Sequence, residues 1–186
     1  AGGSGGAPGA GGAPGANGGN ATVGTDPGAP TGAVFGDIAA PCGPATGDTS
    51  ANTASDKGIT PTEISIGAIS DPGGPKPGLN QGMLDSMEAF GKWCNELGGI
   101  NGRMLKVNLR DAGILQYKTR VEEACGEDFA LVGGLGVFDN LGAQTQVDCG
   151  LVNVTGAAVT PEQTMAELTY QVNPNRPDRY LTGPTD

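Results

Sequence analysis

Residues 129–134 read Phe-Ala-Leu-Val-Gly-Gly, an almost unbroken apolar run that ends in two glycines. Such runs are typical of strands in a parallel sheet that is buried on both faces. Other short apolar segments lie on either side of it, separated by stretches with helical periodicity. The expected strands are 63–69, 104–109, 129–134, 151–154 and 170–172, and the expected helices are 79–97, 117–124, 139–148 and 161–168. This alternation predicts a layered α/β domain with a parallel sheet.

The longest expected helix has an apolar residue every third or fourth position and stops at Gly98-Gly99. Its expected inward residues are Leu79, Met83, Met87, Phe90, Cys94 and Leu97. Asp139 is expected to cap the third helix with its side chain, and Pro161 to open the fourth.

The N-terminal part of the chain differs sharply in composition. Residues 1–36 contain 14 glycines and 4 prolines, in repeats such as Gly5-Gly-Ala-Pro-Gly-Ala10. Such a segment buries too little apolar surface to offset the entropy lost on ordering, so a flexible, extended arm is expected over 1–55. The folded domain is expected over 56–186.

Composition excludes several classes of protein. The net charge is −10, with 10 Lys and Arg against 20 Asp and Glu and no basic cluster, which disfavours nucleic-acid binding. The absence of histidine removes Ser-His-Asp chemistry and His-based zinc sites, and no apolar stretch is long enough for a membrane helix. The run Gly133-Gly-Leu-Gly136 lacks the spacing of a dinucleotide-binding loop, so no cofactor or metal is expected.

The four cysteines contain no Cys-x-x-Cys pair. They predict two disulfides formed in an oxidising compartment, the alternative being buried free thiols, and their pairing stays open at this point. The chain starts at Ala1 without a methionine, as a processed, exported protein would. An extracellular, cell-surface or periplasmic location is therefore expected.

In an open parallel sheet, ligands bind outside the carboxyl ends of the strands. The expected ligand end here comprises three loops rich in Gly and small residues, 70–78, 134–140 and 155–160, although these are also what tight strand-to-helix turns look like. Helix N-termini after such loops favour an anionic group. Asp71, Asp111 and Asp139 lie near this end, but scattered carboxylates more often cap turns than perform catalysis, so the protein is not expected to be an enzyme.

Three segments occur in an order and spacing that resemble a known family: Gly58-Ile-Thr-Pro-Thr-Glu-Ile-Ser-Ile-Gly67, Asn95-Glu-Leu-Gly-Gly-Ile-Asn-Gly-Arg103 and Phe129–Gly134. They resemble the extracellular substrate-binding proteins of branched-chain amino-acid type ABC importers, in a version similar to actinobacterial ones. The resemblance implies a three-layer, Rossmann-like lobe with strand order 2-1-3-4-5, in which the chain holds the N-terminal lobe of two. It also implies delivery of a small polar solute, such as an amino acid, to the membrane subunits of an ABC importer.

Laying the sequence on the family pattern implies a set of ligand-binding residues. They are Asp71, Gly136, Val137, Phe138, Ala157 and Thr160. Val137 and Val159 stand where the family would place hydroxyl side chains that grip an amino acid. The alternative is a structural or accessory subunit of an extracellular assembly, with the arm docking on a neighbouring subunit or a second copy.

The strand order that the resemblance implies also suggests a disulfide pairing. Helices two and three would lie side by side, with Cys125 and Cys149 at their ends and within bridging distance. Cys94 is then left for Cys42, which would attach the base of the arm to the domain.

Overall fold

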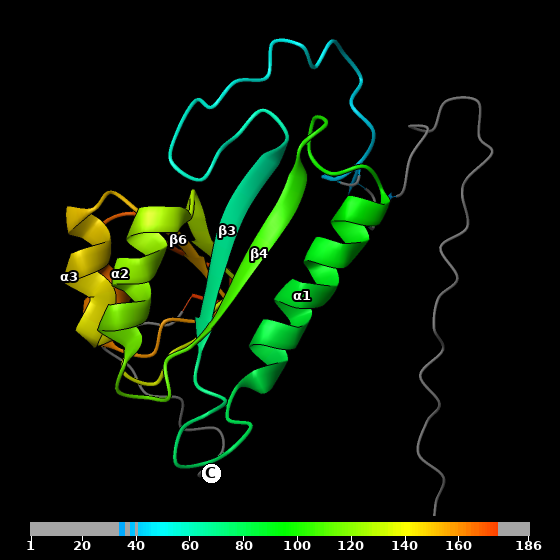
Figure 1. The fold of residues 1–186 in the computed structure, drawn as a ribbon. Helices are drawn as coiled ribbons and strands as arrows, with labels where there is room; N and C mark the ends of the chain where they lie inside the picture. Colours follow the sequence, from blue (N-terminus) through cyan, green and yellow to red (C-terminus); the bar gives the residue numbers. More distant parts are fainter. Residues whose placement is uncertain (1–33, 36–37, 40, 175–186) are drawn as a thin grey trace, which may run out of the picture. The chain divides into compact units, whose positions relative to one another are not determined.

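The computed structural model describes residues 34–35, 38–39 and 41–174 (Figure 1). The chain divides after Ala39 into two units, each described here by itself. In the first, β1 (Val34–Phe35) pairs antiparallel with β2 (Ile38–Ala39). Most of the expected arm lies outside the described residues.

The second unit contains a five-stranded sheet in which every pair of neighbouring strands is parallel. Its order is β4-β3-β5-β6-β7, which confirms the expected order 2-1-3-4-5. The strands are β3 (Glu63–Ser70), β4 (Met104–Asp111), β5 (Ala130–Val132), β6 (Val152–Thr155) and β7 (Thr169–Gln171). The central strand β3 is buried from Ser65 to Ser70, as expected for a strand covered on both faces.

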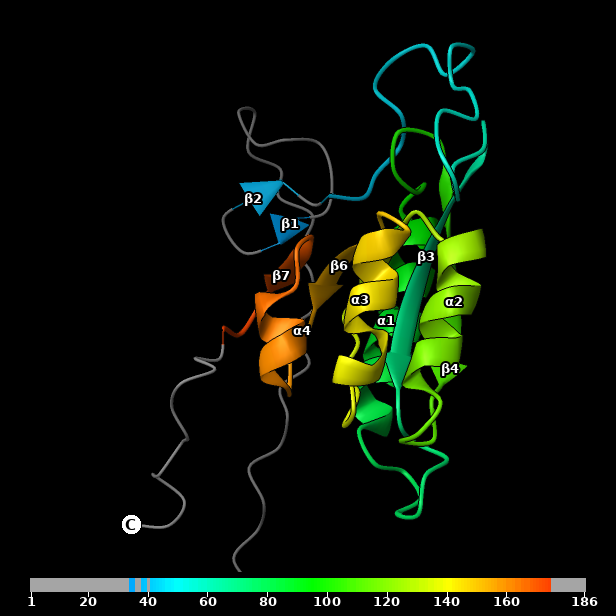
Figure 2. The ribbon, with the colours of Figure 1, turned by 90° about the vertical axis from the view of Figure 1, so that its left-hand side faces the viewer.

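Helices cover both faces of the sheet and give three layers (Figures 1 and 2). α1 (Gln81–Glu96) packs on β3 and β4 from one side. α2 (Tyr117–Glu127) and α3 (Asn140–Asp148) lie side by side on the other face, and the short α4 (Pro161–Met165) contacts α3 and β7. No helix among the described residues is long and apolar enough to cross a membrane.

The buried face of α1 differs from the one that the apolar spacing predicts. Leu84 and Gly91 are buried with Met87 and Cys94, whereas Leu79 and Leu97 are only partly buried and lie outside the helix. Gly91 is buried because Val107 of β4 packs against it; a Cβ there would lie 2.5 Å from Val107 Cγ2. Gly91 thus lets the helix and the sheet approach closely, a role that the spacing of apolar residues cannot predict.

Two further elements are shorter than expected. The strand expected over 129–134 is β5, and it covers only Ala130–Val132. Phe129, the residue before it, is 43% exposed. α4 ends at Met165 rather than at residue 168, because Ala166 is extended and Leu168 has φ +62°.

A buried ionic cluster lies between the sheet and α2. The Arg110 guanidinium, 7% exposed, donates to Asp128 Oδ2 at 2.5 Å and to Glu127 Oε2 at 2.8 Å. Asp128 also accepts from the Asn108 amide at 2.6 Å, so the buried carboxylate has partners on two side chains of β4. A Cβ on Gly67 of β3 would lie 2.7 Å from Arg110 Nη1, so this glycine leaves the room that the ion pair needs.

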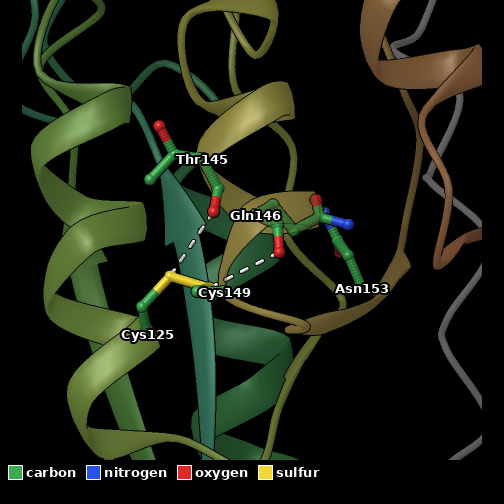
Figure 3. Close-up of a disulfide and its surroundings, with 5 residues drawn as sticks. All are labelled: Cys125, Thr145, Gln146, Cys149 and Asn153. Carbon is green, nitrogen blue, oxygen red and sulfur yellow. Dashed lines mark hydrogen bonds between the residues drawn. A yellow bond between two sulfur atoms is a disulfide. The ribbon is translucent and has the colours of Figure 1, made fainter.

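Both disulfides have the expected pairing. Cys42 joins Cys94 near the end of α1, with Cα atoms 5.1 Å apart. Cys125 joins Cys149, with Cα atoms 6.0 Å apart, and bridges the C-terminal ends of α2 and α3 (Figure 3).

Part of the expected arm is attached to the lobe. Beyond the Cys42 disulfide, the Gly43 amide donates to the Gly99 carbonyl at 2.8 Å and the Asn52 side chain donates to the Asn101 carbonyl at 2.9 Å. These contacts lie within the unit that follows Ala39, and the boundary expected at residues 55 and 56 stays a prediction.

Candidate functional site

The loops that follow β3, β5 and β6 meet at the carboxyl edge of the sheet, which we call the rim. The hydroxyl of Ser70, at the end of β3, lies 3.1 Å from the Asn80 carbonyl and 3.0 Å from the Leu135 carbonyl. The Thr155 hydroxyl, at the end of β6, lies 2.8 Å from the Gly134 carbonyl. Because these hydroxyls link neighbouring loops, the rim is held together by its own side chains.

Asp71 joins two of the rim loops. Its side chain is fully buried; Oδ1 accepts from the Ile114 amide and Oδ2 from the Val137 amide, both at 2.6 Å. Ile114 has φ +76°, a conformation that a β-branched residue rarely adopts. The Asp71 carboxylate therefore fixes a strained turn after β4 and the loop after β5 at once.

Asp139 fixes the loop after β6 in the same way, through hydrogen bonds to its carboxylate. The expectation that its side chain caps α3 is wrong, because it makes no cap hydrogen bond to that helix. Its oxygens instead accept from the Val159 amide at 2.7 Å, and from the Thr160 amide at 3.1 Å and hydroxyl at 2.5 Å. Burial raises the pKa of the Asp139 carboxyl, and the hydrogen bonds from Thr160 and Val159 partly oppose that shift.

Tyr117 interacts electrostatically with both carboxylates. Its side chain is 4% exposed, and burial raises the pKa of the phenol, with the charge of Asp139 adding to the shift. A Cβ on Gly136 would collide with the Tyr117 ring, so Gly136 must be glycine for the ring to fit under the loop. Tyr117 thus acts as a neutral, packed support for the rim.

The structure places the six predicted ligand-binding residues on adjacent loops but gives them different surroundings. Asp71 and Gly136 are buried, Val137, Ala157 and Thr160 are partly buried, and Phe138 is 43% exposed. Val159, beside Thr160, is 50% exposed. The residues that meet solvent here are therefore largely apolar.

The sequence placed Asp139 near the ligand end, but as a helix cap, and it did not assign Ile114 or Tyr117 to the site. Each contacts a residue distant in the chain, and only the strand order could have placed Asp139 beside the loop after β6. The spacing of Asp139 from its partners, 20 and 21 residues, has no local signature.

The chemistry of the rim follows from these contacts. A carboxylate ligand would bind free backbone amides, but those of Val137, Val159 and Thr160 already donate to the buried aspartates. The loops after β5 and β6 contain no Lys or Arg. Within the described residues, no group of three or more Cys, Asp or Glu could hold a metal ion.

No protein-family model matches the chain, and no curated protein matches its sequence. Solved structures do match. One is a fatty acid ABC transporter substrate-binding protein from Thermomonospora curvata, with a TM-score of 0.50 and 20% identity, covering 54% of this chain and 27% of that one. Another is the branched-chain amino acid transporter substrate-binding protein LivJ from Streptococcus pneumoniae str. Canada MDR_19A in complex with isoleucine, with a TM-score of 0.53 and 15% identity, covering 59% of this chain and 33% of that one.

These likenesses show a fold shared with substrate-binding proteins of ABC transporters. The chain spans about a third or less of the length of those structures.

Proposed function

We propose that the chain is one lobe of an exported solute-binding protein that delivers a small molecule to the membrane subunits of an ABC importer. The observation that carries the proposal is the all-parallel sheet of order β4-β3-β5-β6-β7 with three fixed loops at its carboxyl edge. Both structures named above are substrate-binding proteins of ABC transporters. The lobe would form one wall of a ligand site, and it is a binding protein rather than an enzyme.

The rim favours a solute whose apolar part faces this lobe. Phe138 and Val159 are exposed there, while the nearby amides are engaged by Asp71 and Asp139. An amino acid with an aliphatic side chain or a short fatty acid has such an apolar part, and LivJ, one of the structures of this fold, holds isoleucine. The polar end of the solute would then be bound by groups outside these two loops.

Two disulfides support export, because such bonds persist mainly in oxidising compartments. The alternative function, an accessory subunit whose arm docks on a neighbour, depends on residues outside the described part of the chain. No contact of the described residues favours it.

Amide-resolved NMR tests the proposal, because it detects the weak binding expected of a single open lobe. The 15N-labelled chain is titrated with isoleucine, hexanoate and, as a polar comparison, glutamine. We expect chemical-shift changes at Val137, Phe138 and Val159 with the first two solutes, reduced in Phe138→Ser. The control is Tyr170→Ser, because Tyr170 is 59% exposed on β7, outside the rim loops.

Two outcomes would contradict the proposal. One is that no solute shifts the rim amides at millimolar concentration. The other is that the shifts lie elsewhere on the lobe and survive the Phe138→Ser change.

A further inference from the structure

A groove lies between α3 and the segment that contains α4. Figure 2 shows α3 and α4 next to each other. The volume of the groove is about 470 Å³. Ala143, Gln144 and Val147 line it from α3, and Glu162, Met165 and Glu167 from the other side. The groove is separate from the rim residues assigned to the solute, and its role does not depend on the proposed function.

The groove combines negative charge with an uncovered apolar residue. Met165 is 73% exposed, far more than a methionine that only fills a core. Glu162 and Glu167 are exposed and form no ion pair within the described residues. From residue 121 to residue 174 the sequence contains eight Asp and Glu and no Lys or Arg, so no cation of that stretch offsets these charges.

A second observation at the same helix junction concerns Gln163, which is 1% exposed. Its amide nitrogen donates to Gln146 Oε1 of α3 at 2.8 Å and to the Thr169 hydroxyl at 2.9 Å. Its Oε1 is the one buried side-chain oxygen in the described part of the chain that lacks a hydrogen-bond donor. This buried oxygen is not part of the groove lining, so the groove's preference for a cationic partner comes from the carboxylates of Glu162 and Glu167, which do line it.

A further apolar residue follows α4: Leu168 is 37% exposed. A small cation would leave Met165 and Leu168 uncovered. A helix from another protein would cover them, because an amphipathic helix lays an apolar stripe into a groove and carries charged residues along its margins.

We propose that the α3–α4 groove docks a basic amphipathic helix of a partner protein. An apolar residue of that helix packs on Met165, and flanking Lys or Arg side chains pair with Glu162 and Glu167. The pairing is electrostatically specific: acidic helices and anionic lipid surfaces are repelled by the same carboxylates.

Fluorescence anisotropy tests the docking with a defined probe. The probe is a labelled 18-residue peptide of Leu and Lys arranged with helical period, and the comparison peptide has Glu in place of every Lys. The intact chain should bind the Lys peptide and not the Glu peptide, and binding should weaken as salt rises.

Variants then locate the site. Glu162→Gln with Glu167→Gln should weaken binding by about three- to tenfold, as expected for two surface ion pairs. Met165→Ser should weaken it by roughly tenfold through loss of the apolar anchor. Gln144→Lys, on the opposite wall, should weaken it as well, and this variant stands in if the others prove unstable by circular dichroism.

The matched control removes two exposed charges from α1 on the other face of the sheet, by Asp85→Asn with Glu96→Gln. If the control weakens binding as much as the groove variants do, peptide binding depends on the net charge of the chain alone and the proposal is wrong. Equal binding of the Lys and Glu peptides would also overturn it. So would complete displacement of the peptide by equimolar N-acetyl-lysine amide, because that result identifies a small-cation site and not a docking surface.

Discussion

Asp71→Asn is the sharpest test of how the rim is held together. Asparagine keeps the shape of aspartate but has one acceptor oxygen, whereas Asp71 uses both oxygens on the amides of Ile114 and Val137. One amide must then face the asparagine NH₂ group, and the remaining hydrogen bond loses its charge. Losing one charge-assisted bond and leaving a donor unpaired amounts to about 3 kcal/mol of unfolding free energy.

For a domain of this size, that loss lowers the melting temperature by roughly 10 °C. Urea unfolding of the 186-residue chain measures the free energy, and amide hydrogen exchange locates the effect. Exchange should accelerate at Ile114 and Val137, whereas the Val159 amide, held by Asp139, should keep its protection.

The control is Asp111→Asn, at the end of the neighbouring strand. Asp111 is exposed, and within the described part of the chain its side chain accepts a hydrogen bond only from the nearby Gly113 amide, so the change should be within about 0.5 kcal/mol. The reasoning is wrong if Asp71→Asn lowers the unfolding free energy no more than this control does and leaves the amides of Ile114 and Val137 protected from exchange.

Three further perturbations have defined outcomes. Because burial raises the folded-state pKa of Asp139 above 3.8, its protonation contributes stability that is complete below 3.8 and is lost as pH rises through the folded pKa. The stability of the wild type relative to Asp139→Asn should therefore increase on acidification from neutral pH, as measured by urea unfolding across that range. Gly67→Ala brings a methyl group against Asp128 and should cost about 2–4 kcal/mol, visible as a lower urea midpoint at constant slope. Replacing Cys42 and Cys94 by serine opens a loop with a sequence separation of 52 and should cost about 4 kcal/mol in urea unfolding, whereas reducing the wild-type protein should cost more because it also opens Cys125–Cys149.

The parallel sheet could be predicted because it depends on features that the sequence repeats, whereas its strand order was implied by the family resemblance. Apolar runs recur at each strand, and the helices between them force parallel connections. The disulfide pairing followed from the family resemblance, since the strand order brings the ends of α2 and α3 together.

The contacts of the rim could not be predicted in the same way. Asp71 and Val137 are 66 residues apart, and their hydrogen bond depends on the conformation of two loops. Ile114 adopts a positive φ that its residue type disfavours, so propensity points away from the observed turn. Asp139 directly precedes α3, where a side-chain helix cap is common. In the structure its side chain is buried and accepts a hydrogen bond from the Val159 amide in the loop after β6 instead.

The bond between Cys42 and Cys94 also determines how a pulling force would enter the lobe. Tension applied on the N-terminal side of Cys42 passes through sulfur into the last turn of α1, because Cys94 lies in that helix. The backbone between Cys42 and Cys94, which includes β3, carries no tension as long as the disulfide is intact. Because β3 and Asp71 lie between the two bridged cysteines, the load would bypass the loop that contains Asp71, whereas the loops joined by Asp139 follow Cys94 in the chain and would not be shielded.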